Sequence, residues 1–147
     1  MRSIDIHAHI TPENCLRAME NNNGWHCLSS QQISRRYQGY TPRGMWNPDD
    51  RIKDMDSLGV DMHVLSTHSF LYAYECDPSD VLKMDQECNE YVSQLTKSYP
   101  TRFSGLANLP MQDVKTSVTE LERCVNVLGL KGAMIGDHVN GLTYDDP

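Results

Sequence analysis

The sequence lacks several features that would assign it at once to a class of protein. No stretch approaches the roughly 20 consecutive apolar residues of a membrane-spanning helix, and the first residues lack the apolar run of a signal peptide. Lysine and arginine are scattered, and the formal net charge is −7. These absences predict a cytoplasmic protein whose partners include neither membrane nor nucleic acid.

Paired cysteines are also missing. The five cysteines include no C-x-x-C pair, and their odd number fits neither a closed disulfide framework nor a zinc knuckle. We therefore expect reduced thiols at all five positions: Cys15, Cys27, Cys76, Cys88 and Cys124. Because Cys88 and Cys124 fall in stretches with helical apolar spacing, both are predicted to be core residues.

What is present indicates a folded α/β domain. Hydrophobic residues make up 39% and charged residues 22% of the 147 positions, which is typical of globular chains. Four short apolar runs alternate with amphipathic stretches, as in βαβ units with a parallel sheet. The predicted strands are Ile4–Ile10, 60–67, 103–109 and 132–136, and the predicted helices are about 49–58, 79–99 and 118–128.

The ends and faces of these helices can also be predicted. Gly59, Pro100 and Gly129 mark helix ends, and Ser79 is the expected N-cap of the second helix. The third helix should bury an apolar stripe made of Val118, Leu121, Cys124, Val125 and Leu128.

Residues 12–48 have a different character from the rest. They are rich in Asn, Gln, Ser, Gly and Arg and show weak periodicity, so they are predicted to form a long loop insertion after the first strand. Long connections in compact domains are usually functional, and a lid or pocket wall is favoured over a disordered excursion. Trp25 and Trp46 either wall a pocket or, as we favour, pack this segment onto the rest of the chain.

The first strand carries two histidines on one face. Because strand side chains alternate, Asp5, His7 and His9 share a face, and Ile4, Ile6, Ala8 and Ile10 share the other. Two adjacent imidazoles can bind one divalent cation. Asp5 either accepts a ring N–H from this pair or is a simple carboxylate at the start of the strand. The pair taken alone also fits a purely structural role.

The remaining histidines are weaker candidates. His68 follows the second predicted strand and His138 the fourth, at the strand ends where barrel enzymes bind substrate. A pocket role and an ordinary loop role are equally favoured for both. His26 and His63 are expected to be structural.

These motifs together resemble a known family. The chain is similar to the amidohydrolase superfamily, within it to the branch that contains aminocarboxymuconate semialdehyde decarboxylase, and the similarity extends in order over almost the whole chain. The matching stretches include Ile4-Asp5-Ile6-His7-Ala8-His9, Trp46-Asn47-Pro48, Leu65-Ser66-Thr67, Tyr99-Pro100-Thr101-Arg102-Phe103, Leu109-Pro110-Met111-Gln112, Glu122-Arg123-Cys124-Val125 and His138-Val139-Asn140.

The resemblance implies a TIM-type (β/α)₈ barrel that binds one divalent metal, usually zinc, with His7 and His9 as two of its ligands. In that family the metal activates a water, and the decarboxylases remove a carboxyl group from a small acidic, conjugated or aromatic substrate. The family's substrate-carboxylate arginine corresponds to Gly39 here, which leaves Arg36 and Arg43 as candidate replacements.

Four strands cannot close an eight-stranded barrel, so we expect the amino-terminal part of one, about four βα units in residues 1–147. The family's other metal ligands and its catalytic histidine would then lie beyond Pro147. Three hypotheses follow: a metal-dependent decarboxylase, a hydrolase or hydratase of the same superfamily, or a non-catalytic truncated form. A half-barrel exposes sheet edges and an apolar interior, so a homo-oligomer is also expected.

Overall fold

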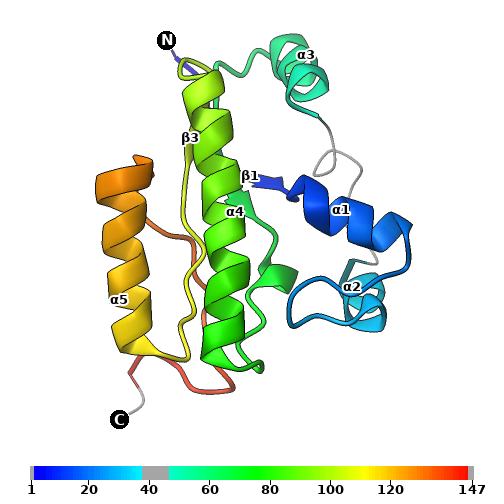
Figure 1. The fold of residues 1–147 in the computed structure, drawn as a ribbon. Helices are drawn as coiled ribbons and strands as arrows, with labels where there is room; N and C mark the ends of the chain where they lie inside the picture. The colour runs from blue at the N-terminus through cyan, green and yellow to red at the C-terminus, as the bar shows by residue number, and fades with distance from the viewer. Residues whose placement is uncertain (1, 38–46, 146–147) are drawn as a thin grey trace.

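The computed structural model describes residues 2–37 and 47–145 (Figure 1). Strands and helices alternate along most of the chain. The order is β1 (Ile4–Ile10), α1 (Glu13–Glu20), α2 (Ser30–Tyr37), α3 (Pro48–Leu58), β2 (Met62–Thr67), the 3₁₀ turn η2 (Ser69–Leu71), α4 (Pro78–Ser98), β3 (Phe103–Gly105), α5 (Val114–Arg123) and the π-helical segment η3 (Cys124–Leu128). None of the described helices is both long and apolar enough to cross a membrane.

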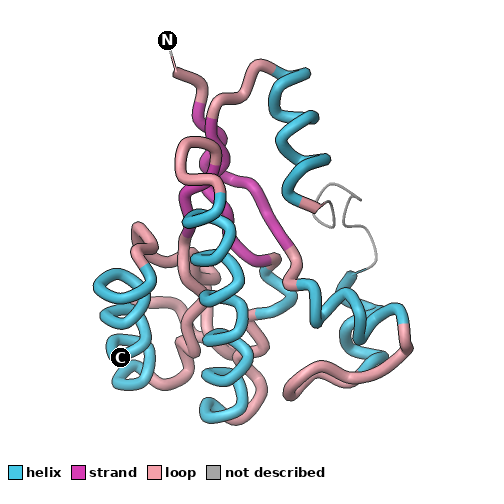
Figure 2. The backbone as a smooth tube through the Cα atoms, turned by 45° about the horizontal axis from the view of Figure 1, so that its top comes forward, coloured by secondary structure: helices cyan, strands magenta, loops and turns pink. Residues whose placement is uncertain are grey.

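The three strands form one parallel sheet in the order β1-β2-β3. His9 pairs with Ser66 of β2, and Leu65 pairs with Gly105 of β3. Figure 1 shows α4 crossing in front of the strands with α5 at its side, and Figure 2 shows the same arrangement from a tilted direction. The predicted α/β class with parallel strands is therefore confirmed.

One face of the sheet packs against the helices. Ala8 and Ile10 of β1 and Leu65 of β2 are buried in a core that α4 covers with Val92 and Leu95. The side chains of His7 and His9, which alternate with Ala8 and Ile10 along β1, therefore lie on the opposite face of the sheet. Ile4 and Ile6 were predicted to share the buried face of Ala8 and Ile10 but are 49% and 73% exposed, because a register shift between Asp5 and Ala8 interrupts the alternation of β1.

Side-chain caps define where the helices begin. The Asn47 side chain accepts a hydrogen bond from the Asp50 N–H, and Pro48 occupies the first turn of α3, where a missing N–H costs nothing. The prediction of Ser79 as the N-cap of α4 was wrong. Asp77 is the cap, because Pro78 follows it at the first helical position and the Asp77 carboxylate accepts from the Ser79 N–H at 2.9 Å.

The third and fourth strands are shorter than predicted. Regular strand structure in β3 ends at Gly105, and the predicted strand 132–136 is present only as an isolated parallel bridge between Ala107 and Ala133. The Asn89 carboxamide accepts from the Asn108 N–H at 2.7 Å and donates to its carbonyl at 3.0 Å. Because a side chain occupies these backbone groups, the ladder cannot continue through Asn108.

The buried face of α5 also differs from the predicted stripe. Val118 and Val125 are 51% and 43% exposed, whereas Ser117, Glu120 and Cys124 are buried. Glu120 can be buried because Arg123, Asn89 and the Cys124 thiol all donate to its carboxylate. Burial of Cys88 and Cys124 is as predicted.

The segment after β1 is more ordered than a long irregular loop. Its described part contains α1 and α2, and Figures 1 and 2 both show these helices together at one side of the sheet, away from α5. They pack through a second apolar cluster with η2 and the start of α4, which includes Cys15, Trp25, Ile33, Leu71 and Met84. The prediction that Trp25 packs this segment onto the chain is confirmed, since Trp25 is 7% exposed.

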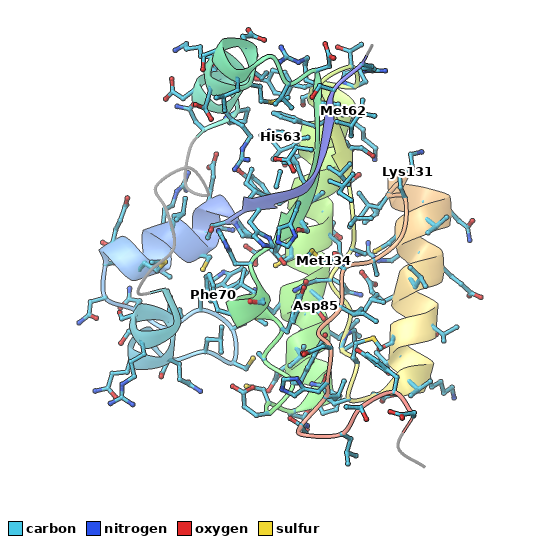
Figure 3. The ribbon with its side chains drawn as sticks, turned by 180° about the vertical axis from the view of Figure 1, so that it is seen from behind. Met62, His63, Phe70, Asp85, Lys131 and Met134 are labelled. Atoms are coloured by element: carbon cyan, nitrogen blue, oxygen red, sulfur yellow. The ribbon has the colours of Figure 1, made fainter. Side chains whose placement is uncertain are left out.

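A buried polar network joins α4 to the ends of β2 and β3. Asn108 donates to Asp85 Oδ1 at 3.1 Å and accepts from the Thr67 hydroxyl at 2.8 Å. Asp85, which Figure 3 labels on α4, is 0% exposed, and no hydrogen bond from the described residues reaches its Oδ2. Burial raises the pKa of Asp85 well above its usual value, the Asn108 hydrogen bond opposes that shift and the Glu120 charge adds to it.

This pKa shift makes stability depend on pH. Asp85 binds its proton more tightly in the folded chain than in the unfolded chain, so its contribution is complete below about pH 4 and is lost as pH rises toward the folded pKa. We expect the free energy of unfolding to fall over that window by up to about 1.4 kcal/mol per pH unit. Asp85→Asn should remove this slope in urea unfolding measured across pH.

Asp113→Asn is the matched control. Asp113 caps α5, and its hydrogen bonds to the Thr116 backbone lower its pKa. Its contribution to the free energy of unfolding is therefore lost as pH falls. Asp113→Asn should change the acidic side of the stability profile, where Asp85→Asn has no effect on the slope. An unchanged difference between wild type and Asp85→Asn at every pH would contradict a proton held on Asp85.

Candidate metal-binding site

The two histidines of β1 point to one place. Their Nε2 atoms lie 3.0 Å apart, and their rings meet edge to face with centroids 4.7 Å apart. Both residues lie near the carboxyl end of β1, on the face opposite Ala8 and Ile10. The period-two alternation of the strand thus brings together the two residues that the sequence proposes as metal ligands.

The prediction that Asp5 shares a face with His7 and His9 is wrong. Asp5 pairs with His63 and Ala8 pairs with Leu65, so Asp5 lies on the Ala8 side of the sheet. The pairing of β1 with β2 shifts register between Asp5 and Ala8. There the Asp5 Oδ1 accepts a hydrogen bond from the His7 backbone N–H at 2.9 Å, and Oδ2 lies 3.7 Å from His63 Nε2. Of the two roles considered for Asp5, the structure therefore favours the local one at the start of the strand.

Two neighbours, Ser66 and Arg51, hold His9 in place, and the sequence predicted a role at the site for neither of them. Ser66 Oγ lies 3.1 Å from His9 Nδ1, which leaves Nε2 free to face His7. Arg51 Nη2 donates to the His9 carbonyl at 2.6 Å from α3. The ring is thus held from one side and the backbone from the other.

His68 comes directly after β2 and packs against the site. Its ring centroid is 4.8 Å from that of His9 and 5.7 Å from that of Phe70, and its side chain is buried. Burial lowers the pKa of His68 to about 3, with further lowering from His9 and Arg51. Burial and the nearby His7 also lower the pKa of His9. Both imidazoles are therefore neutral near pH 7, the form in which a histidine binds a metal.

The remaining histidines, His26, His63 and His138, do not contact the ring nitrogens of His7 and His9 in the described structure. His63, buried on β2, lies 3.4 Å from Arg51 Nη1, and His26 pairs with Glu87 at 2.7 Å. These contacts agree with the structural roles expected for both. His138 is exposed and contacts Asp137 at 2.7 Å, so the described structure gives it no buried pocket position.

The pair fits half of a metal site. At the 2.0–2.1 Å bond length of zinc, two nitrogens on a tetrahedral ion are roughly 3.3 Å apart, close to the observed separation. Among the described residues no group of three or more His, Cys, Asp or Glu side chains could hold a metal. A catalytic zinc usually has three protein ligands, so the described residues supply two donors and a complete site needs more.

Several residues of the predicted long loop cannot be given a place relative to the site. Gly39, Arg43 and Trp46 lie outside the described residues, and so does the side chain of Arg36. Their predicted roles therefore stay predictions.

The geometry defines a class of fold. Parallel strands joined by helices, with polar side chains gathered at the carboxyl end of the sheet, are the arrangement from which a (β/α)₈ barrel is built. The Amidohydrolase family profile matches residues 4–147. The chain belongs to this family. Its relatives include decarboxylases, which are carboxy-lyases.

Three comparisons give the scale of the similarity. The 2-amino-3-carboxymuconate-6-semialdehyde decarboxylase of Dictyostelium discoideum is 37% identical over 153 residues, which cover 98% of this chain and 43% of that protein. The structure of 5-carboxyvanillate decarboxylase from Sphingomonas paucimobilis matches with a TM-score of 0.78 at 28% identity, over 99% of this chain and 46% of that one.

The third is a dihydroxybenzoic acid decarboxylase from Polaromonas sp., solved with bound manganese and the inhibitor 2-nitroresorcinol. It matches with a TM-score of 0.69 at 26% identity, over 92% of this chain and 39% of that chain. The present chain thus spans less than half the length of each of these three relatives.

Proposed function

We propose that this chain is the amino-terminal part of a metal-dependent decarboxylase of the aminocarboxymuconate semialdehyde type, acting on a small acidic, conjugated or aromatic substrate. The observation that carries the proposal is the 3.0 Å approach of His7 Nε2 and His9 Nε2 at the carboxyl end of β1. Membership in a family with decarboxylase relatives supports the reaction class. A cytoplasmic location is retained as part of the proposal.

In this proposal each residue of the site has a distinct task. His7 and His9 donate their Nε2 atoms to the cation, while Ser66 holds Nδ1 of His9. A divalent cation bound there would activate a water and stabilise negative charge as carbon dioxide leaves. Neutral, buried His68 lies beside His9 and supplies an apolar and aromatic surface next to the ion.

The metal is proposed to be zinc, as the sequence resemblance implies. Manganese is the competing choice, because the Polaromonas relative was solved with it. Imidazole nitrogen binds both ions, and the ligands that would discriminate between them are not among the described residues. Metal analysis of protein purified without added metal decides between them.

Carbon dioxide release by the full-length gene product is the direct test. The protein should be loaded with zinc or manganese and given 2-amino-3-carboxymuconate semialdehyde or 2,6-dihydroxybenzoate. Turnover of one of these acids supports the proposal. Hydration or hydrolysis of such an acid without carbon dioxide release would instead support the second candidate, a hydratase or hydrolase of the same superfamily.

The third hypothesis concerns the 147-residue chain by itself. It offers two metal donors among its described residues and an outer strand with Ile4 and Ile6 exposed. Self-association of this chain therefore stays a prediction. Decarboxylation by the 147-residue chain alone would contradict a non-catalytic form.

We expect Ser66 to contribute to metal affinity but not to the stability of the fold. Ser66→Ala removes the contact that fixes the His9 ring, so we expect the metal affinity of the full-length protein to fall about 10–100-fold. Isothermal titration with zinc measures this change. Ser57→Ala, on the exposed side of α3, is the control and should bind as wild type. Equal affinities for the two variants would remove Ser66 from the site.

A further inference from the structure

Two of the five cysteines lie side by side in space although 49 positions separate them. Cys27 lies between α1 and α2, and Cys76 lies between η2 and α4. The Cys76 thiol donates to the Cys27 carbonyl oxygen across 3.8 Å. The structure contains both as free thiols.

These two thiols are also the accessible ones. All five cysteines are among the described residues; Cys15, Cys88 and Cys124 are 0% exposed, whereas Cys27 and Cys76 are only partly buried. A small reagent can therefore reach the pair without unfolding the chain, while the other three thiols stay protected.

The backbone on both sides of the pair is fixed. Trp25 and Leu28 exchange backbone hydrogen bonds around Cys27, at 2.8 and 3.0 Å. The Cys76 N–H donates to the Ala73 carbonyl, and its own carbonyl accepts from Gln112 at 3.2 Å. Both cysteines pack against the same apolar cluster. The backbone that carries each thiol is thus held in place next to the other residue.

We propose that Cys27 and Cys76 form a dithiol–disulfide site that a small-molecule disulfide oxidises. One thiol loses its proton and attacks a sulfur of the oxidant, which releases the first small thiol. The second protein thiol then attacks the mixed disulfide and displaces the second small thiol. Two electrons pass from the protein to the oxidant, and the two protein hydrogens end on the released thiols.

The surroundings determine which oxidant suits the site. Burial raises the pKa of Cys27 to about 12, and the neighbouring Cys76 and the Asp80 carboxylate add to this rise. Thiolate is therefore scarce near pH 7 and oxidation is slow. Because Glu75, Asp77 and Asp80 are close in sequence to Cys76, a neutral disulfide reacts more readily than an anionic one.

The bond would join two parts of the fold. It would fasten the connection between α1 and α2 to the start of α4, across the second apolar cluster. A cross-link over 49 positions restricts the unfolded chain strongly. We therefore expect the thermal unfolding midpoint to rise by roughly 5–15 °C on oxidation.

The test uses the 147-residue chain and 2-hydroxyethyl disulfide as the neutral oxidant. After incubation at pH 8, free thiols are alkylated under native and then denaturing conditions, and peptides are mapped by mass spectrometry. We expect one Cys27–Cys76 cross-linked peptide, with Cys15, Cys88 and Cys124 alkylated only after denaturation. Cys27→Ser and Cys76→Ser should each leave a mixed disulfide on the remaining partner and show no rise in midpoint.

Stable mixed disulfides on both cysteines of the wild-type chain would overturn the proposal, because the pair would then fail to close. Cross-links that include a buried cysteine, or that join two chains, would overturn it as well. Circular dichroism of each variant before oxidation verifies that it is folded, and a mixed disulfide on the remaining thiol then shows that the oxidant reached the site.

Discussion

Replacing His7 and His9 together by alanine should abolish tight metal binding by the full-length protein. Both Nε2 atoms face one point, so the double variant removes both donors that the described residues supply. Loss of partners that merely orient a ligand costs about 10–100-fold in affinity, and we expect a loss of more than about 100-fold here, with decarboxylation lost in parallel. Metal content after dialysis and carbon dioxide release measure the two effects.

His138→Ala is the matched control for this experiment. His138 also follows a predicted strand but is exposed and contacts Asp137. It should keep both the metal and the activity. Stoichiometric metal in the His7→Ala/His9→Ala variant would disprove the proposed ligand role.

Replacing Asn108 by alanine should cause the largest loss of stability. Asn108 is 3% exposed; its side chain accepts from the Thr67 hydroxyl and donates to Asp85 and to the Leu71 carbonyl. Each buried polar group left without a partner costs about 1–3 kcal/mol. We therefore expect the free energy of unfolding to fall by about 3–5 kcal/mol, measured by urea denaturation.

Asn126→Ala is the control for this substitution, since Asn126 is exposed on η3 and should change stability by less than about 0.5 kcal/mol. A double-mutant cycle with Asp85→Ala isolates the bond between Asn108 and Asp85. The interaction energy of residues in one network is about 0.5–3 kcal/mol. Additive effects of the two substitutions would mean that the network is not energetically coupled.

Local sequence signals predicted the class of fold and the ligand pair. Alternating apolar runs identified β1 along its full length and the parallel βαβ order. Gly59 and Gly129 end α3 and η3 in left-handed backbone conformations, as a residue without a Cβ permits. The shared side of His7 and His9 follows from strand periodicity alone, so no tertiary information was needed to find it.

Helix faces and strand ends were predicted less well, because long-range polar contacts decide them. Hydropathy placed Val118 and Val125 inside, yet both are exposed and Glu120 is buried. Its carboxylate accepts a hydrogen bond from Asn89 of α4 and forms an ion pair with Arg123. The same Asn89 ends the ladder at Asn108. A hydropathy pattern carries no information about such partners, which lie up to 31 positions away.

The sequence by itself determined that two imidazoles leave one face of the first strand, because a strand places alternate residues on the same side. Only the tertiary structure decided what surrounds them. The register that sets His9 opposite Ser66 joins residues 57 positions apart, and the same pairing packs His68 against the His9 ring. Such contacts depend on how strands align in space, and neither composition nor periodicity specifies that alignment.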